Sequence, residues 1–511
     1  MRKWLPLVAI CLGAFMLLID VSIVNVALPK MSDDLHSSFT SLQWVVDMYA
    51  LVLAALLLAV GSIGDRIGHR RLYVGGLVLF AAASAWSALA GSTGELIAAR
   101  TLMGGGAAIV MPLTLAIVAA TFDDADRPKA IAVITAAIAG GLPLGPIAGG
   151  FLLQHFYWGS VFWINLPVVA IAIAAGALLL RESRNPGAGR LDIPGVLLVV
   201  GSVVALIYGF ISAPENGWGS ARTIGLLAGA AVLMAAFAIW ERRTTDRLVD
   251  PALFRNARFT WGTMAAVAVS VALFGVLFIV PQFLQAVSGY DALGTGLRLV
   301  PLMGGLLVGG GVAGPIDKLI GTRITVTAGL VLLAAGLVVL SRATASGGYG
   351  VLVVGLTVCG AGVGGAMAPA MDAVTAEVGD EAGAGSAVTN TLRQVGGALA
   401  IAVLGSVLSA VYSERLGAAL AGLPASAAHT ARESVMGAVT IAQGLGAQHQ
   451  SAGATLRNAA GDAFAHAMSI VMLSCTGVVL LGAVLCLLFL PARRSAVSAG
   501  PVLSEFEAVS G

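Results

Sequence analysis

Fourteen apolar stretches, each near the length of a transmembrane helix, recur along the chain of 511 residues. An α-helix needs roughly 20 consecutive apolar residues to cross the hydrocarbon core of a bilayer. The stretches cover 5–29, 44–63, 72–91, 95–120, 130–153, 161–180, 193–212, 222–240, 261–284, 294–315, 323–341, 350–372, 388–411 and 465–491. Only 11% of the residues are charged, whereas soluble proteins carry about 25%. We therefore predict an all-α polytopic membrane protein with fourteen transmembrane helices.

Basic residues divide unequally between the two sets of loops that alternate along such a chain. Twenty of the 28 Lys and Arg residues lie in loops and tails on the same side of the membrane as the N-terminus, and six lie in loops on the opposite side. Loops rich in Lys and Arg remain in the cytoplasm. The asymmetry therefore predicts that the N- and C-termini are both cytoplasmic, and it supports an even number of helices.

The composition and the motifs exclude several function classes. The net charge of +2 does not predict nucleic-acid binding. The four cysteines lie in apolar runs without metal-ligand spacing, and the six histidines are scattered. No phosphate-binding loop is visible in the sequence, so we expect no cofactor, no metal and no enzymatic activity. Transport by this chain would then draw on an ion gradient.

A glycine-rich and proline-rich segment interrupts the fifth apolar stretch. Its notable positions are Gly141, Gly145, Pro146, Gly149 and Gly150. Gly141, Gly145 and Gly149 recur every four residues, so they form one helix face without side chains, which permits close helix packing. This face indicates a hinge or a seal between moving parts of the bundle. A structural kink with no moving role is the alternative.

Two short loops in the chain resemble each other. Segments 61–70 and 314–323 each contain a glycine, an acidic and a basic residue in succession, a further glycine and an arginine. The repeat predicts two six-helix halves with two inserted helices between them. Repeated halves are the architecture of secondary transporters, whose substrate site lies near the membrane midplane between the halves.

The first of these loops has the residues of a cytoplasmic latch. An aspartate can interact with the positive N-terminal end of a neighbouring helix, and an arginine can reach across the gap. We expect this latch to hold the cytoplasmic side in one conformation, and a generic basic turn is the alternative. The latch residues are Gly61, Asp65, Arg66, Gly68 and Arg70.

The repeat and the apolar stretches divide the chain into predicted units. The loop before the last helix is long, and we expect it to form a helical hairpin outside the cell; a loosely ordered loop is the alternative. The units are an N-terminal half at 1–185, two inserted helices with their cytoplasmic loop at 186–258, helices nine to thirteen at 259–411, the extracellular loop at 412–463, the last helix at 464–491 and a cytoplasmic tail at 492–511.

Three charged residues lie within or close to the apolar stretches of the N-terminal half. Asp20 lies inside the first stretch, where a charged carboxylate is costly and can instead take up a proton. Asp47 is a second candidate for proton coupling, with a solvated helix cap as its alternative. Arg100 needs a partner, such as Asp20 or backbone carbonyl groups. A purely structural ion pair is the alternative for Arg100, as packing is for Asp20.

Six motifs carry a family resemblance that spans the whole chain. They lie at 18–29, 61–71, 100–108, 141–150, 156–167 and 390–397. In this order they resemble the motifs of the major facilitator superfamily, and within it those of the fourteen-helix drug:proton antiporters. The chain departs from the family pattern at His69, Tyr73 and Met103. It also lacks the carboxylate that some relatives carry in helix thirteen.

The resemblance implies a proton-coupled antiporter in the plasma membrane of a bacterial cell. Such a protein exports lipophilic, cationic drugs or biocides from the cytoplasm. The resemblance implies proton coupling or cation binding at Asp20, with Asp47 as its partner, and proton transfer at Arg100. Its partners would be a small-molecule drug, protons and the lipid bilayer, and we expect a monomer. A narrow exporter of one antibiotic or metabolite is the alternative.

Overall fold

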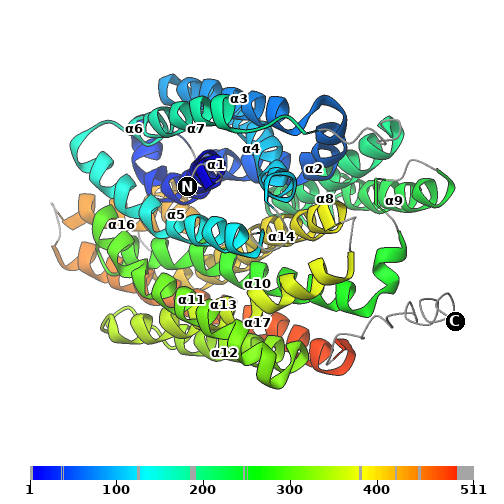
Figure 1. The fold of residues 1–511 in the computed structure, drawn as a ribbon. Helices are drawn as coiled ribbons and strands as arrows, with labels where there is room; N and C mark the ends of the chain where they lie inside the picture. The colour runs from blue at the N-terminus through cyan, green and yellow to red at the C-terminus, as the bar shows by residue number, and fades with distance from the viewer. Residues whose placement is uncertain are drawn as a thin grey trace, which may run out of the picture.

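The computed structural model describes residues 4–35, 37, 39–122, 127–183, 192–244, 248–249, 251–378, 382–420, 423–446 and 450–491. Throughout these ranges the regular elements are α-helices and short 3-10 or π segments, without a β-strand. The prediction of an all-α fold is therefore confirmed. Two bundles of helices lie one above the other in Figure 1, with the N-terminal half above the C-terminal half.

The N-terminal half contains seven helices around one apolar core. They are α1 (Leu5–Leu35), α2 (Phe39–Ile67), α3 (His69–Leu89), α4 (Thr93–Thr121), α5 (Arg127–His155), α6 (Ser160–Trp163) and α7 (Asn165–Leu179). The stretch predicted as one helix at 161–180 is divided at Ile164 between α6 and α7. Each half buries its own apolar residues, as two bodies that move relative to each other require.

The C-terminal half follows two inserted helices and has a core of its own. The insert comprises α8 (Ile193–Asn216) and α9 (Ala221–Arg243), and a 3-10 turn, η2 (Pro251–Arg255), precedes the second half. The second half contains α10 (Ala257–Gln282), the π segment η3 (Phe283–Val287), α11 (Ala292–Ile320), α12 (Thr322–Leu340), α13 (Gly350–Val378), α14 (Ala382–Leu416), η5 (Gly417–Leu420), α15 (Ala425–Glu433), α16 (Val435–Gly446) and α17 (Gln450–Phe489).

A third apolar cluster joins the insert to both halves. It contains Leu51 of α2, Val203 of α8 and Ala398 of α14. In Figure 1, α8 and α9 lie at the side of the molecule, and α14 lies where the two halves meet. The insert therefore packs beside the contact between the halves and does not separate them.

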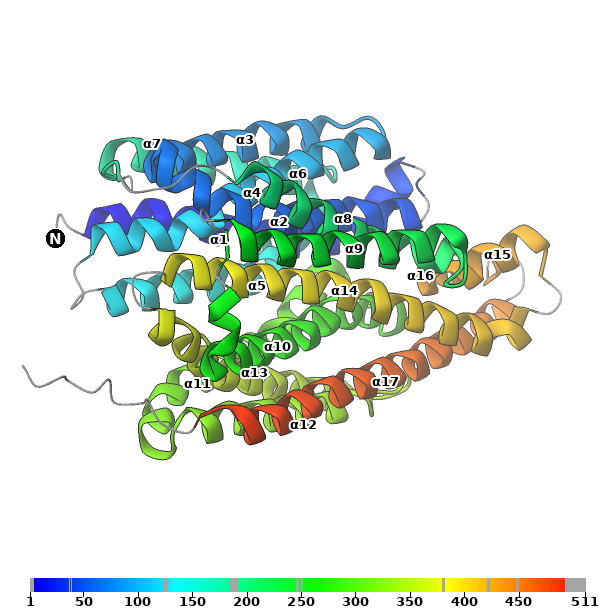
Figure 2. The ribbon, with the colours of Figure 1, turned by 90° about the vertical axis from the view of Figure 1, so that its right-hand side faces the viewer.

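All fourteen predicted stretches fall on helices, and twelve described segments are long and apolar enough to cross a membrane. Helices α2 and α5 are 29 residues long, but the number of crossings remains a prediction. Figure 2 shows α1 beginning and α17 ending at the same end of the bundle. Helices α15 and α16 lie at the opposite end. Their extracellular location and the cytoplasmic termini remain predictions.

The region 412–463, which was expected to form a helical hairpin, contains the helices α15 and α16 together with the ends of two longer helices. Helix α14 continues to Leu416, and α17 begins at Gln450, well before the last apolar stretch. The Tyr412 hydroxyl donates a hydrogen bond of 3.1 Å to the carbonyl oxygen of Ala431, which ties α14 to α15. The helices therefore extend beyond the apolar stretches because they pack on one another there.

The two repeated loops adopt the same kind of backbone turn. Gly68 separates α2 from α3 with φ of 112°, and Gly321 separates α11 from α12 with φ of 84°. Positive φ angles are accessible to glycine without the steric cost that a Cβ atom brings. The sequence repeat is thus also a structural repeat of the two halves.

Candidate functional site

A buried ion pair occupies the interior of the N-terminal half. Asp20 on α1 is 0% exposed and Arg100 on α4 is 1% exposed. Arg100 Nη1 lies 2.5 Å from Asp20 Oδ2. Arg100 Nε also donates a hydrogen bond of 3.3 Å to the carbonyl oxygen of Val45. The structure supplies both kinds of partner that the sequence argument required for this arginine.

Aromatic rings enclose the guanidinium group of Arg100. Its Cζ atom lies 4.3 Å from the centroid of the Tyr49 ring and 5.9 Å from that of Phe162. A cation above an aromatic face is attracted by the ring quadrupole, and more strongly where water is excluded. Arg100 therefore retains favourable contacts even when its carboxylate partner is neutral.

Asn165 is a third member of the cluster that the sequence analysis did not select as a site residue. Its Nδ2 donates hydrogen bonds to Asp20 Oδ1 at 3.1 Å and to Ser84 Oγ at 3.0 Å. The Ser84 hydroxyl in turn donates to the carbonyl oxygen of Phe162 at 2.9 Å. Asn165 and Ser84 are both 0% exposed. A lone amide inside an apolar stretch was the signal in the sequence that could have identified Asn165.

The break between α6 and α7 places Asn165 at the cluster. The carbonyl oxygen of Ser160 accepts a hydrogen bond from the amide of Ile164, and Asn165 then begins α7. Asn165 Oδ1 is buried and accepts no hydrogen bond from the described residues. An amide carries both a donor and an acceptor. Asn165 can therefore donate to a charged Asp20, or accept from a protonated one.

Asp47 lies on α2, the helix that also contributes contacts to Arg100. It is 2% exposed and lies on α2 between Val45 and Tyr49, both of which contact Arg100. This burial disfavours the interpretation of Asp47 as a solvated helix cap. Residues two apart on a helix point in different directions, so Asp47 does not share the face of α2 that contacts Arg100. The described ion pair joins Asp20 and Arg100.

The glycine face of α5 packs against the turn of α1 that carries Asp20. A Cβ atom added at Gly141 would lie 2.8 Å from the Phe15 carbonyl oxygen. One at Gly145 would lie 2.9 Å from the Ile19 carbonyl oxygen, and one at Gly149 would lie 2.7 Å from Ile23 Cγ1. The predicted close packing is therefore present. Its partner, however, is a helix of the same half.

The contact of α5 with the other half lies on a different side of the helix. A Cβ atom on Gly296 of α11 would lie 2.7 Å from the backbone carbonyl carbon of Pro146. Beyond it, Gln154 Nε2 donates a hydrogen bond of 2.5 Å to Asp291 Oδ2. Gly150 is buried. Helix α5 thus contacts α1 through its glycines and α11 through Pro146.

The predicted latch is only partly visible in the described residues. Gly61 and Asp65 lie in α2, but their side-chain surroundings fall outside the described part of the structure, and Arg66 is partly buried. Gly68 makes the turn. Whether Asp65 and Arg66 act as a latch remains a prediction.

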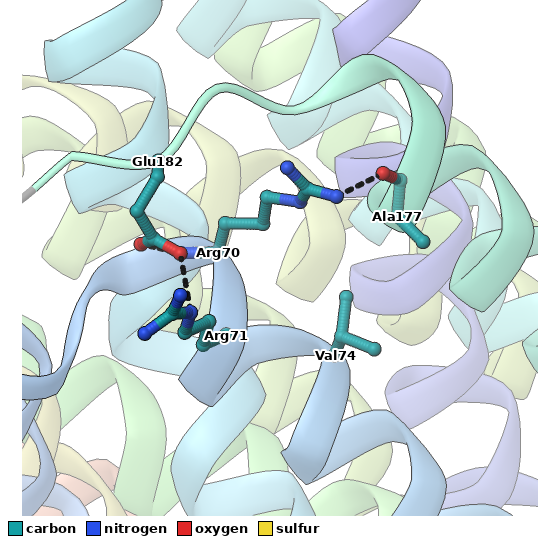
Figure 3. Close-up of a pocket in the computed structure, with 5 residues that line it drawn as sticks. All are labelled: Arg70, Arg71, Val74, Ala177 and Glu182. Atoms are coloured by element: carbon teal, nitrogen blue, oxygen red, sulfur yellow. Dashed lines mark hydrogen bonds and ion pairs between the residues drawn. The ribbon is translucent and has the colours of Figure 1, made fainter.

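Arg70 binds the end of the last helix in its own half, as Figure 3 shows. Its Nη2 donates to the carbonyl oxygen of Ala177 near the end of α7. Its backbone amide donates to Glu182 Oε1 at 3.2 Å, and Arg71 Nε lies 3.6 Å from Glu182 Oε2. These residues and Val74 line a shallow pocket. Arginine is favourable here because helix C-termini expose unpaired carbonyl groups.

The second repeated loop makes the equivalent contact. Arg323 follows Gly321 by two residues, as Arg70 follows Gly68. It donates to the carbonyl oxygens of Leu487 and Leu488 near the end of α17, the last helix of its half. In each half, the arginine after the glycine turn therefore caps the final helix.

Comparison with known proteins identifies the family. Residues 10–401 match the Major Facilitator Superfamily. The chain belongs to this superfamily. The resemblance recognised in the motifs is thus confirmed, and the chain is a multi-pass membrane transporter of the superfamily.

Three relatives illustrate the similarity. The chain is 34% identical over 410 residues to the tetracenomycin C resistance and export protein of Streptomyces glaucescens, covering 80% of this chain and 76% of that protein. It is 33% identical to the multidrug efflux pump LfrA of Mycolicibacterium smegmatis, covering 87% of this chain and 88% of that protein. It is 32% identical to the methyl viologen resistance protein SmvA of Salmonella typhimurium, covering 94% of this chain and 97% of that protein.

Solved structures show the same fold. A bacterial homolog to the human lysosomal transporter Spinster, inward-facing and unoccupied, matches with a TM-score of 0.62 at 16% identity, covering 97% of this chain and 99% of that one. The POT family transporter PepTSo matches with a TM-score of 0.60 at 14% identity, covering 96% of this chain and 97% of that one. At these identities the likeness concerns the fold alone.

Proposed function

We propose that this chain is a proton-coupled antiporter that exports lipophilic drugs from the cytoplasm across the bacterial plasma membrane. The observation that carries the proposal is the buried cluster of Asp20, Arg100 and Asn165. The names of the relatives, which include a multidrug efflux pump and resistance proteins, support drug export. A carboxylate inside a membrane protein is a functional group by default because its charge is costly there.

Protonation of Asp20 is the proposed coupling step. In the outward-facing state a proton reaches Asp20 and neutralises the carboxylate that pairs with Arg100. The new O–H group donates to Asn165 Oδ1, which is otherwise without a donor among the described residues. Arg100 keeps the Val45 carbonyl oxygen and the Tyr49 ring. The cluster then carries a net positive charge, which expels a bound cation.

The packing of α5 links this step to the movement of the halves. Gly145 and Gly149 contact Ile19, which precedes Asp20 on α1, and Ile23, which lies three residues after it. A shift of that turn therefore moves α5, which contacts α11 of the other half through Pro146. Because close-packed helices deform little, such a shift is transmitted instead of being absorbed. Release of the proton to the cytoplasm returns the cluster to its paired state.

A narrow exporter of one antibiotic is the second candidate. The names of two relatives favour it, the tetracenomycin C resistance and export protein and, at 36% identity, the puromycin resistance protein pur8 of Streptomyces alboniger. Both candidates use the same proton-coupling cluster. They differ only in the range of compounds accepted.

Everted membrane vesicles test the proposed function. A proton gradient is imposed, and uptake of the lipophilic cation ethidium is measured for the wild type, Asp20→Asn and Asp34→Asn. The last variant is a matched control because Asp34 lies on the same helix but is exposed. We expect uptake by the wild type and Asp34→Asn and none by Asp20→Asn. Equal uptake by all three would place the coupling carboxylate elsewhere, with Asp47 the next candidate.

A wild type that transports no ethidium would favour the narrow exporter. The same vesicles would then be tested with neutral antibiotics such as puromycin. Proton-driven uptake of one antibiotic, lost in Asp20→Asn, would support the second candidate. No proton-driven uptake of any tested compound by correctly inserted protein would contradict both.

A further inference from the structure

A second arginine lies inside the bundle, in the C-terminal half. Arg393 lies on α14, within the apolar segment Val388–Leu416. Its Nε donates to Ser270 Oγ on α10 at 3.1 Å, and its Nη1 donates to Asn390 Oδ1 at 3.1 Å. Ser270 lies thirteen residues after the start of α10, which is about 20 Å along the helix. The guanidinium group is therefore deep in the membrane-spanning region.

The charge of Arg393 has no acidic partner among the residues that the structure describes. Both of its hydrogen-bond partners are neutral, and among the described residues it forms no ion pair. Helix α10 contains no Asp or Glu, and the only one in α14 is Glu414, 21 residues away. Arg100, in the other half, is paired with Asp20. An uncompensated arginine at this depth is costly, so it marks a functional group.

The donors of Arg393 are only partly used. A guanidinium group has five N–H donors, and only Nε and Nη1 donate to described residues. The Ser270 hydroxyl donates onward to the Ala266 carbonyl oxygen at 2.9 Å. Nη2 makes no hydrogen bond to the described residues. The edge formed by Nη1 and Nη2 therefore remains available, and this edge binds carboxylate groups in a bidentate manner.

The surroundings of Arg393 are otherwise apolar. Cβ atoms on Gly396 and Gly397 would lie 2.9 Å from Val267 Cγ1 and 2.7 Å from Phe274 Cδ2 of α10, so α14 approaches α10 closely there. Leu392 packs in the apolar cluster shared with α2 and α8. Arg393 is partly exposed. A cation with an available edge thus lies on α14, the helix where the two halves meet, among apolar side chains that suit a lipophilic compound.

We propose that Arg393 is a subsite for an acidic group of the exported compound. Lipophilic compounds that carry a carboxylate, including zwitterions whose cationic end lies toward Asp20, are then the preferred substrate class. The proposal rests on the proposed drug export and adds to it the charge of the cargo. It also gives the C-terminal half a binding role that complements the proton-coupling role of the N-terminal half.

A matched pair of dyes tests this proposal by binding to the purified full-length protein in a neutral detergent. Rhodamine B carries a carboxylate, and its ethyl ester lacks that charge but has the same ring system. Fluorescence polarisation gives the dissociation constant of each dye for the wild type, Arg393→Gln and Arg242→Gln. Arg242 is the control because it is exposed at the end of α9.

We expect Arg393→Gln to weaken rhodamine B binding about tenfold or more, the size of a lost charged hydrogen bond, and to change ester binding less than twofold. Arg242→Gln should resemble the wild type for both dyes. Equal weakening of both dyes in Arg393→Gln would assign Arg393 a structural role and overturn the proposal. The proposal would also be overturned if the wild type did not bind rhodamine B more tightly than its ethyl ester.

Two further variants keep the test decisive if Arg393→Gln does not fold. Arg393→Lys retains the charge but not the bidentate edge, and Ser270→Ala removes the Nε partner. Each should weaken rhodamine B binding selectively by about two- to fivefold, and an unselective effect would overturn the proposal. Asp20→Asn should keep the preference for the acid. Selective binding without proton-driven uptake in vesicles would support the subsite and refute the proposed antiport.

Discussion

Replacing Asn165 by leucine should lower gradient-driven uptake at least tenfold. Leucine has the branched shape of asparagine but cannot donate the 3.1 Å hydrogen bond to Asp20 Oδ1. A hydrogen bond to a charged group is worth about 1.5–3 kcal/mol, and a loss of about 1.4 kcal/mol changes an equilibrium constant tenfold. The paired state of Asp20 and Arg100, to which the cluster must return in each transport cycle, is therefore populated at least tenfold less.

The assay measures gradient-driven ethidium uptake into everted vesicles under one fixed proton gradient. The control is Asn216→Leu, because Asn216 is an exposed asparagine at the end of α8. We expect uptake by Asn165→Leu to fall at least tenfold and uptake by Asn216→Leu to match the wild type. Equal uptake by Asn165→Leu and the wild type would refute the role assigned to this amide.

Three further predictions concern the scaffold and are measured on purified protein by thermal unfolding, with uptake assays where stated. Gly145→Ala should abolish uptake and lower the unfolding temperature, because the added Cβ atom would meet the Ile19 carbonyl oxygen. The control Gly225→Ala should change neither, because the space around Gly225 is open. Gly68→Ala and Gly321→Ala should each destabilise by about 1 kcal/mol because of their positive φ angles, and unchanged unfolding temperatures would contradict the assigned turns. Arg323→Gln should lower the unfolding temperature by freeing the carbonyl oxygens at the end of α17, and an unchanged value would show that this cap contributes nothing.

The sequence alone was sufficient to predict that the apolar stretches are helical and which groups are partners of Arg100. Apolar stretches of spanning length have few alternatives to helix in a membrane. An arginine inside such a stretch requires an acid or carbonyl groups, and Asp20 was the only acid inside the first stretch. Both predictions rest on the cost of burying unpaired polar groups, which does not depend on the details of the fold.

Features set by tertiary packing were not predictable in the same way. The face of Gly141, Gly145 and Gly149 was expected to seal moving parts, but a glycine repeat does not specify its neighbour, and the structure places α1 there. Asn165 was hidden because the break at Ile164 that points it at Asp20 has no strong local signal. The early start of α17 arises from packing against α16, beyond the apolar stretch.

The most direct test of the central claim is proton movement driven by drug in proteoliposomes. Purified wild type or Asp20→Asn is reconstituted with a preformed proton gradient, and a pH-sensitive dye reports the internal pH after ethidium is added. We expect ethidium to dissipate the gradient with the wild type and to leave it intact with Asp20→Asn. An equal ethidium-driven proton flux through both proteins would contradict the assignment of Asp20 as the coupling group.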